Sequence, residues 1–257
     1  MTEALADTTI DAFLGGNLML RQPKRGHRAG HDAVLLAAVT AARPGDRVVE
    51  FGAGVGTAGL ALARRIGGLD LTLVEISELL AVLARENAKA NDIAATVLTF
   101  DVTASAAAFE AAGLAVDSAD AVLMNPPFND PARHRASGDP DKRLAHVASQ
   151  TTLEHWVHAA RRVLKSRGAL TLIWRADGLA EVLAALGRGF GSLAIVPVHP
   201  DLESPAIRVL VRAIKGGRAP LEILPALMLN SASGLPTAEV QDVLAGRTAI
   251  AIGGGRS

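Results

Sequence analysis

Residues 47–57 read Arg47-Val48-Val49-Glu50-Phe51-Gly52-Ala53-Gly54-Val55-Gly56-Thr57. The apolar run at 47–51 predicts a buried strand, and the alternating glycines allow the backbone to pass close to a ligand. The apolar residues after Thr57 predict a helix whose first N–H groups are free to meet that ligand. A tight turn would not require three alternating glycines, so the segment indicates a ligand-binding loop.

The same change from strand to helix recurs along the chain from residue 46 onward. Short apolar runs alternate with alanine- and leucine-rich stretches, which predicts an α/β fold with a mainly parallel sheet. We expect seven strands, at residues 47–51, 71–76, 96–101, 121–125, 169–174, 194–198 and 208–214. We expect helices at residues 58–65, 78–90, 151–164 and 179–186, an earlier helix from an Asp32 cap to residue 42, and a short final helix after Thr237.

The two ends of the chain and one internal segment differ from this pattern. We interpret residues 1–45 as an N-terminal lid segment with a helix, residues 46–215 as the core, and residues 216–257 as an extension packed on the core within a single domain. Residues 129–148 and the segment beyond Lys215 contain several prolines and glycines, which predicts irregular structure in both.

Composition excludes several classes of protein. The 257 residues are 49% apolar, enough to bury one large core. The 26 basic and 26 acidic residues cancel, so affinity for nucleic acid must come from local patches. The absence of cysteine removes disulfides, thiolate nucleophiles and cysteine-ligated zinc. Without a leader peptide pattern or an apolar stretch of membrane length, we expect no membrane association and a cytoplasmic location.

Carboxylates follow the next two strands. Glu75 ends the second expected strand, where a carboxylate can accept hydrogen bonds from both hydroxyls of a ribose, and Asp101 ends the third. For either residue alone, a role in a turn or a helix cap is an equally good interpretation. Together with the glycine loop, they indicate a ligand bound at the carboxyl ends of an open sheet.

The fourth strand leads directly into Asn125-Pro126-Pro127-Phe128. An amine attached to an aromatic ring or a carbonyl has a delocalised lone pair, so a catalyst must orient it toward an electrophile. The side-chain oxygen of Asn125 and the carbonyl of Pro126 can accept its two N–H groups. Phe128 is suited to stacking on a planar base, with core filling as the alternative. Alone, Asn-Pro-Pro would also suit a turn.

The glycine loop and this tetrapeptide together resemble the amino-group methyltransferases that act on adenine, guanine or glutamine amide nitrogens. Within that group, the chain is most similar to the bacterial family that methylates the N6 amine of the adenine next to the anticodon of a valine tRNA. The resemblance includes Gln22-Pro23, residues 26–36, residues 208–216 and residues 220–225. Two departures are Phe128, where many members have tyrosine, and Glu50, where aspartate is commoner.

This resemblance implies a Rossmann-like class I methyltransferase fold with an antiparallel last strand, S-adenosylmethionine as cofactor and S-adenosylhomocysteine as product. The catalytic residues implied are Asn125, Pro126, Pro127 and Phe128. The cofactor-binding residues implied are Glu50, Gly52, Ala53, Gly54, Gly56, Glu75, Ile76, Asp101, Val102 and Asn125, with Arg28 and Asp32 at the amino-acid end of the cofactor.

The expected partner is RNA, and specifically tRNA. Basic residues suited to phosphate contacts are Lys24, Arg25, Arg133, Arg135, Lys142 and Arg143. Because no partner ligand is evident for His155 and His158, which are one helical turn apart, we expect no metal site.

Three alternatives stay open. The same acceptor pair would serve a guanine amine of rRNA or a glutamine amide of a protein. A third possibility is a cofactor-sensing RNA-binding module without turnover. An oxidoreductase that uses NAD is disfavoured, because Thr57 stands where its glycine fingerprint requires glycine.

Overall fold

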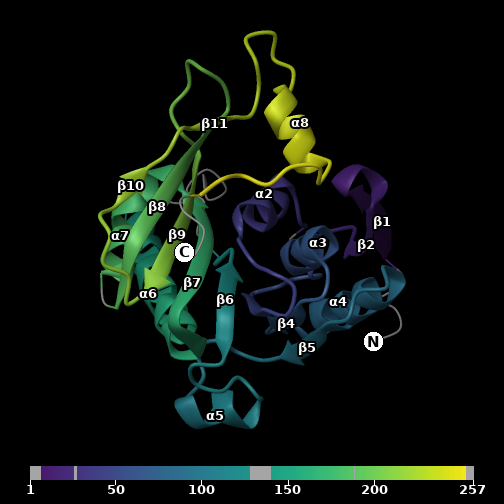
Figure 1. Ribbon diagram of the computed structural model, residues 1–257, viewed down its shortest axis with the longest axis vertical. Helices are drawn as coiled ribbons and strands as arrows, with labels where there is room; N and C mark the ends of the chain where they lie inside the picture. The colour runs from purple at the N-terminus through teal and green to yellow at the C-terminus, as the bar shows by residue number, and fades with distance from the viewer. Residues whose placement is uncertain (1–6, 26–27, 128–139, 188, 253–257) are drawn as a thin grey trace.

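The computed structural model describes residues 7–25, 28–127, 140–187 and 189–252, and of residues 140–151 it describes the backbone only. At its centre is a mixed sheet of order β10-β8-β9-β7-β6-β3-β4-β5, with β11 paired to β8 (Figure 1). Its strands are β3 (Arg47–Phe51), β4 (Asp70–Glu75), β5 (Thr96–Thr99), β6 (Ala119–Met124), β7 (Leu164–Arg175), β8 (Phe190–His199), β9 (Arg208–Lys215), β10 (Glu222–Ile223) and β11 (Leu227–Met228).

The predicted α/β fold is confirmed, and all seven predicted strands are present. The neighbouring strands from β7 through β6, β3 and β4 to β5 all pair in parallel, whereas β9 runs antiparallel between β7 and β8. The prediction of an irregular tail beyond Lys215 is wrong in part, because β10 and β11 add two short strands to β8. Two-residue strands carry too little apolar alternation to be recognised in a sequence rich in proline.

Helices cover both faces of the sheet. They are α2 (His31–Val39), α3 (Thr57–Ile66), α4 (Glu78–Ala90), α5 (Ala106–Ala111), α6 (Pro140–Val163), α7 (Leu179–Leu186) and α8 (Ala238–Leu244). One core cluster joins α2, α3, α4 and α8 to the sheet, and a second joins α5, α6 and α7. In the described segments no helix is long and apolar enough to cross a membrane.

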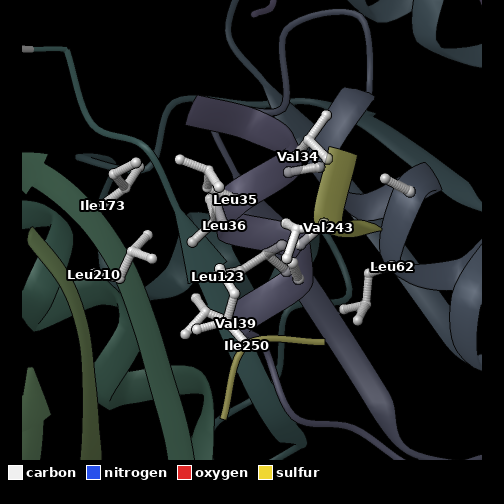
Figure 2. Close-up of a cluster of buried hydrophobic side chains, with 14 of the residues drawn as sticks. Val34, Leu35, Leu36, Val39, Leu62, Leu123, Ile173, Leu210, Val243 and Ile250 are labelled. Carbon is white, nitrogen blue, oxygen red and sulfur yellow. The ribbon is translucent and has the colours of Figure 1, made fainter. Parts of the chain in front are cut away.

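Helix α2 is enclosed on all sides, since every residue from Val34 to Val39 is buried. Figure 2 shows its side chains between the sheet residues Ile173 and Leu210 and the C-terminal residues Val243 and Ile250. The Ile250 N–H also donates to the carbonyl of Ala38 at 3.0 Å. The C-terminal segment therefore covers α2 and completes this half of the core.

The N-terminal segment contains a hairpin that the sequence analysis did not identify. Strands β1 (Thr8–Phe13) and β2 (Leu18–Pro23) pair antiparallel across the short 3-10 turn Leu14–Gly16. The hairpin belongs to the core, because Leu18 and Leu20 are fully buried.

Two predictions about helix starts are wrong. The expected irregular segment up to residue 148 is helical from Pro140, at a position where proline is favoured because its missing N–H would have no partner there. The cap of α2 is Gly30, and the carboxylate of Asp32 accepts a hydrogen bond from Arg208 Nε at 2.9 Å instead. By contrast, α4 and α7 have the predicted bounds, and Thr237 caps α8 by accepting from the Val240 N–H.

Helix α3 lies directly against the sheet at Gly59. A Cβ on this residue would lie 2.5 Å from Leu73 Cδ2 and 2.6 Å from Glu50 Oε2. We expect Gly59→Ala to lower the free energy of unfolding by about 1 to 3 kcal/mol, although alanine is the better helix former. Urea denaturation measures the change. Gly187→Ala is the control, because its backbone is helical and a Cβ there would make only ordinary contacts, at 3.4 and 3.5 Å. Equal stability of Gly59→Ala and the parent would contradict this packing.

Candidate active site

The sheet reverses its strand order between β3 and β6. From β3 the chain moves outward through β4 to β5, and then returns to place β6 on the other side of β3. Ligands of open α/β sheets bind at the carboxyl ends of strands at such a reversal. The pairing register puts Phe51 beside both Val74 and Met124. The next residues along the three strands are therefore neighbours at this edge: Gly52, Glu75 and Asn125.

The glycine loop, residues 52–56, is closely packed at one end and open at its middle. Gly52 has a φ of +67°, and a Cβ on it would lie 2.5 Å from the ring of Trp156 in α6. Gly54 has a φ of +57°, yet a Cβ there would meet no atom within 4 Å in the described parts of the chain. The loop thus leaves space beside Gly54 that a ligand can occupy.

Glu75 ties this loop to the end of β4. Its two carboxylate oxygens accept hydrogen bonds from the N–H groups of Gly54 and Ser77, each at 2.8 Å. Glu75 is 7% exposed, whereas the neighbouring Ile76 is 66% exposed. Since a carboxylate offers about four lone-pair positions, it can accept further hydrogen bonds from a ligand. An acceptor and an exposed apolar side chain therefore lie next to each other beside the loop.

Glu50 is a buried residue of β3, and its side chain contacts the start of α3. Its Oε2 accepts a hydrogen bond from the Gly59 N–H at 2.7 Å. Burial raises the pKa of Glu50 to about 8, the hydrogen bond from Gly59 opposes this rise, and the negative charge of Glu75 adds to it. Glu50 thus holds the first turn of α3 against the sheet and titrates close to neutral pH.

Asp101 lies two residues beyond the end of β5. It is exposed, and its Oδ1 accepts hydrogen bonds from the N–H of Thr103 at 2.8 Å and from the Thr103 hydroxyl at 2.7 Å. The following residue, Val102, is buried. The two hydrogen bonds of Asp101 are those of a carboxylate in a turn. Contact of Asp101 and Val102 with a ligand stays a prediction.

Arg28 and Asp32 are each engaged in an ion pair. Arg28 forms a salt bridge with Asp11 of β1 and donates to the Pro23 carbonyl at 2.7 Å. Asp32 pairs with Arg208 of β9. These pairs join the hairpin to the start of α2 and α2 to the sheet, so the predicted contact with the cofactor would be made in addition to them.

The predicted catalytic tetrapeptide begins directly after β6. Asn125 is half-buried, Pro126 is buried and Pro127 is exposed. Phe128 lies outside the described residues.

The predicted RNA contacts are described only in part. Lys24 forms a salt bridge with Asp7 at 3.0 Å, and Arg25 is exposed. Arg133 and Arg135 lie outside the described residues. Lys142 and Arg143 are in α6, whose described part there is limited to the backbone.

Two residues beside the loop were missed in the sequence analysis. The ring of Trp156 lies against Gly52, and the side chain of Asn87 donates to the Val55 carbonyl at 3.0 Å. Trp156 is one of two tryptophans, and Asn87 is a polar residue within an otherwise apolar helix face. In the sequence, both residues stand out from their surroundings, but neither shows that it contacts the glycine loop.

A separate hollow of about 520 Å³ lies at the opposite, amino edge of the sheet, near His158, Arg161 and Lys215. Lys215 is paired with Asp117, which also lines it. Of the predicted site residues whose side chains the structure describes, none lines this hollow. Among the described residues there is no group of three or more histidines and acids that could hold a metal ion.

The strand order, the antiparallel β9 and the glycine loop at the reversal of the sheet define a Rossmann-like class I methyltransferase. Residues 30–200 match the family model of the methyltransferase small domain, and the chain belongs to this family. It is an S-adenosylmethionine-dependent methyltransferase, as predicted.

Individual relatives differ in the reactions that their names state. The chain is 28% identical over 203 residues to the tRNA1(Val) (adenine(37)-N6)-methyltransferase of Dickeya chrysanthemi, a match that covers 77% of this chain and 76% of that protein. It is also 28% identical over 164 residues to the release factor glutamine methyltransferase of Chlorobaculum tepidum, covering 61% of this chain and 54% of that protein.

A solved structure is similar over almost its whole length. The crystal structure of a predicted O-methyltransferase, protein Atu636 from Agrobacterium tumefaciens, has 35% identity and a TM-score of 0.72, and covers 85% of this chain and 98% of that one. M. jannaschii TYW2, determined in complex with AdoMet, shares the fold at 14% identity and a TM-score of 0.54, over 81% of this chain and 85% of that one.

The residues at the reversal fit the cofactor. The space beside Gly54 allows close approach to the backbone, and the Glu75 carboxylate has acceptor capacity for hydroxyl groups. Ile76 offers an exposed apolar surface for a planar ring. These three features suit the polar and aromatic parts of a nucleoside.

Glu50 makes the stability of the fold depend on pH. Because its pKa is raised in the folded state, this carboxyl destabilises the fold progressively as the pH rises from about 4.5 to about 8. Glu50→Gln keeps an acceptor for Gly59 but cannot ionise. We expect the stability of this variant relative to the parent to increase, by on the order of a few kcal/mol, between about pH 5 and pH 8.5. Urea denaturation across this range measures it, with the exposed Glu154→Gln as control. A constant difference would contradict the burial of an ionisable Glu50.

Proposed function

We propose that this enzyme methylates the exocyclic N6 amine of adenine in tRNA, in the cytoplasm. The observation that carries the proposal is the position of Asn125 and Pro126. They directly follow β6 at the strand-order reversal, just beyond the pairing of Met124 with Phe51, and Gly52 of the glycine loop follows Phe51. The side-chain oxygen of Asn125 and the carbonyl of Pro126 therefore lie in a segment that begins beside the glycine loop.

The proposed chemistry depends on orientation of a weak nucleophile. When bound, S-adenosylmethionine supplies a methyl group activated by its sulfonium. Asn125 Oδ1 and the Pro126 carbonyl accept the two N–H groups of the amine, which directs its lone pair away from both acceptors and toward the glycine loop. Phe128 stacks on the base and limits its tilt. Pro127 keeps the chain extended between these groups, because proline disfavours helical backbone at the residue before it.

We assign the cofactor to the edge formed by the three strand ends. The glycine loop, with Gly52, Ala53, Gly54 and Gly56, receives its amino-acid part, with Arg28 and Asp32 nearby. Glu75 accepts from the ribose hydroxyls, and Ile76, Asp101 and Val102 surround the adenine. Glu50 supports the glycine loop indirectly, because its hydrogen bond with Gly59 fixes the first turn of α3, which follows the loop.

The choice of tRNA adenine is supported by the likeness to the enzyme of Dickeya chrysanthemi, which its name describes as acting on adenine 37 of tRNA1(Val). Basic side chains would hold the RNA through its phosphates, and those we assign are Lys24, Arg25, Arg133, Arg135, Lys142 and Arg143.

A second candidate is a glutamine amide of a protein, favoured by the likeness to the release factor enzyme of Chlorobaculum tepidum. A primary amide presents the same pair of N–H groups, so Asn125 and Pro126 would orient it equally well. A guanine amine of rRNA is chemically equivalent, whereas an oxygen target would leave one acceptor unused.

Transfer of a labelled methyl group distinguishes these targets. The enzyme is incubated with labelled S-adenosylmethionine and either tRNA, rRNA or total protein, and each product is digested and analysed by mass spectrometry. We expect label in N6-methyladenosine from tRNA. Label in N2-methylguanosine, N5-methylglutamine or an O-methylated nucleoside would identify the corresponding alternative and contradict the proposal.

Asn125→Ala removes one of the two acceptors. We expect kcat to fall by about 100-fold or more, as for loss of a group that acts chiefly in the transition state, with little change in affinity for S-adenosylhomocysteine. The exposed Asn17→Ala is the control, and thermal denaturation verifies that both variants are folded. Activity of Asn125→Ala within a few-fold of the parent would exclude the proposed role of this side chain.

A further inference from the structure

Two buried asparagines at the end of α4, one in its last turn and one at its C-cap, connect the N-terminal hairpin to the rest of the protein. Asn87 and Asn91 are four residues apart, so they lie on one face of the helix end, and they are 2% and 7% exposed. The free energy of burying a carboxamide is favourable only when its donors and acceptor are all paired.

Each of the two side chains pairs with the backbone of one residue of β2. Asn91 Oδ1 accepts from the Met19 N–H at 2.9 Å and its Nδ2 donates to the Met19 carbonyl at 2.7 Å. Asn87 makes the same two contacts with Arg21, at 2.7 and 3.1 Å. Because Met19 and Arg21 are two residues apart, these groups lie on one edge of β2. The two carboxamides thus complete that edge as a third strand would.

Asn87 makes one contact for which Asn91 has no counterpart. Its Nδ2 also donates to the carbonyl of Val55 at 3.0 Å. Val55 stands between Gly54 and Gly56, which both have positive φ, and it is itself buried. The additional bond of Asn91 goes instead to the Asn87 carbonyl within the helix. One carboxamide therefore bonds the hairpin and the glycine loop at the same time.

We propose that Asn87 is a positioning residue that fixes the Val55 peptide and makes cofactor binding depend on docking of the N-terminal hairpin. The proposal rests on the assignment of residues 52–56 to the cofactor. Glycines on both sides leave the Val55 peptide free to rotate, and the bond from Asn87 removes that freedom before the ligand arrives. Linkage requires the reverse effect as well, so bound cofactor strengthens docking of the hairpin.

The side-chain chemistry at this position is restrictive. The site uses two N–H donors, to the carbonyls of Arg21 and Val55, and one acceptor, for the Arg21 N–H. A neutral primary carboxamide supplies this set, whereas an aspartate would present oxygen to both carbonyls. Alanine would leave three backbone groups, the Arg21 N–H and the carbonyls of Arg21 and Val55, without these partners.

The test compares Asn87→Ala with Asn91→Ala, which also breaks two bonds to β2 but none to the loop. The affinity for S-adenosylhomocysteine is measured by isothermal titration calorimetry on the full chain, and urea denaturation measures stability. We expect Asn87→Ala to bind about tenfold or more weakly, the effect of one lost buried hydrogen bond to the loop. Asn91→Ala leaves the bonds of Asn87 to Arg21 and Val55 in place, so the hairpin stays docked and the affinity stays within about twofold of the parent. Tryptophan fluorescence is a second readout, because Trp156 lies against Gly52.

The coupling is overturned if Asn87→Ala binds within twofold of the parent, or if both variants weaken binding equally. Gly54→Val tests the underlying assignment separately, since its side chain would enter the space beside the loop. Loss of binding by Gly54→Val with normal binding by Asn87→Ala refutes the coupling alone. Unchanged binding by Gly54→Val refutes the assignment of the loop, and with it the proposal.

Hydrogen exchange of the parent protein provides a test that needs no substitution, in case Asn87→Ala does not fold. We expect S-adenosylhomocysteine to slow exchange of the Arg21 amide, which bonds to Asn87, more than that of the Met19 amide, which bonds to Asn91. Protection limited to residues 52–57, with exchange at Arg21 unchanged, would contradict the proposal.

Discussion

The parallel pairing of β3 with β4 on one side and β6 on the other is the constraint on which the other features depend. With Phe51 held between Val74 and Met124, the three strands end together, and the segments that follow them begin at one edge. Glu75 can then accept from Gly54, and Gly52 and Asn125 each follow directly on the paired residues Phe51 and Met124. A shift of one residue in either pairing would move a strand's side chains to the opposite face and separate these groups.

Much of this sheet could be predicted, because its strands are buried on both faces and give continuous apolar runs. Strand β3 and helices α4 and α7 have the predicted bounds, and a recognisable serine cap precedes α4. The hairpin β1–β2 was missed although Gly15 and Gly16 separate two strand-like runs. The edge of β2 that does not pair with β1 forms hydrogen bonds with Asn87 and Asn91. These residues are more than sixty positions away and give no local signal. The start of α6 was not predicted, because the prolines and glycines of residues 129–148 indicate irregular structure, whereas Pro140 occupies the first turn of the helix.

The candidate site was predictable as a set of residues at strand ends, but its contacts were not. Sequence order alone indicated Gly52, Glu75 and Asn125, since parallel strands bring their carboxyl ends together. It could not show that Glu50 is buried against Gly59, or that Asp32 pairs with Arg208, because each partner depends on how α3 and β9 pack. The contact of Trp156 with Gly52 likewise joins segments about a hundred residues apart. These contacts join groups that several segments contribute, so local pattern alone could not specify them.

A crystal structure of the full chain with S-adenosylhomocysteine is the most direct measurement of the central claim. The account predicts the ligand across the ends of β3 and β4, with its ribose at Glu75 and its sulfur facing Asn125 Oδ1 and the Pro126 carbonyl. A ligand bound away from the glycine loop, or both oxygens turned away from the sulfur, would contradict it.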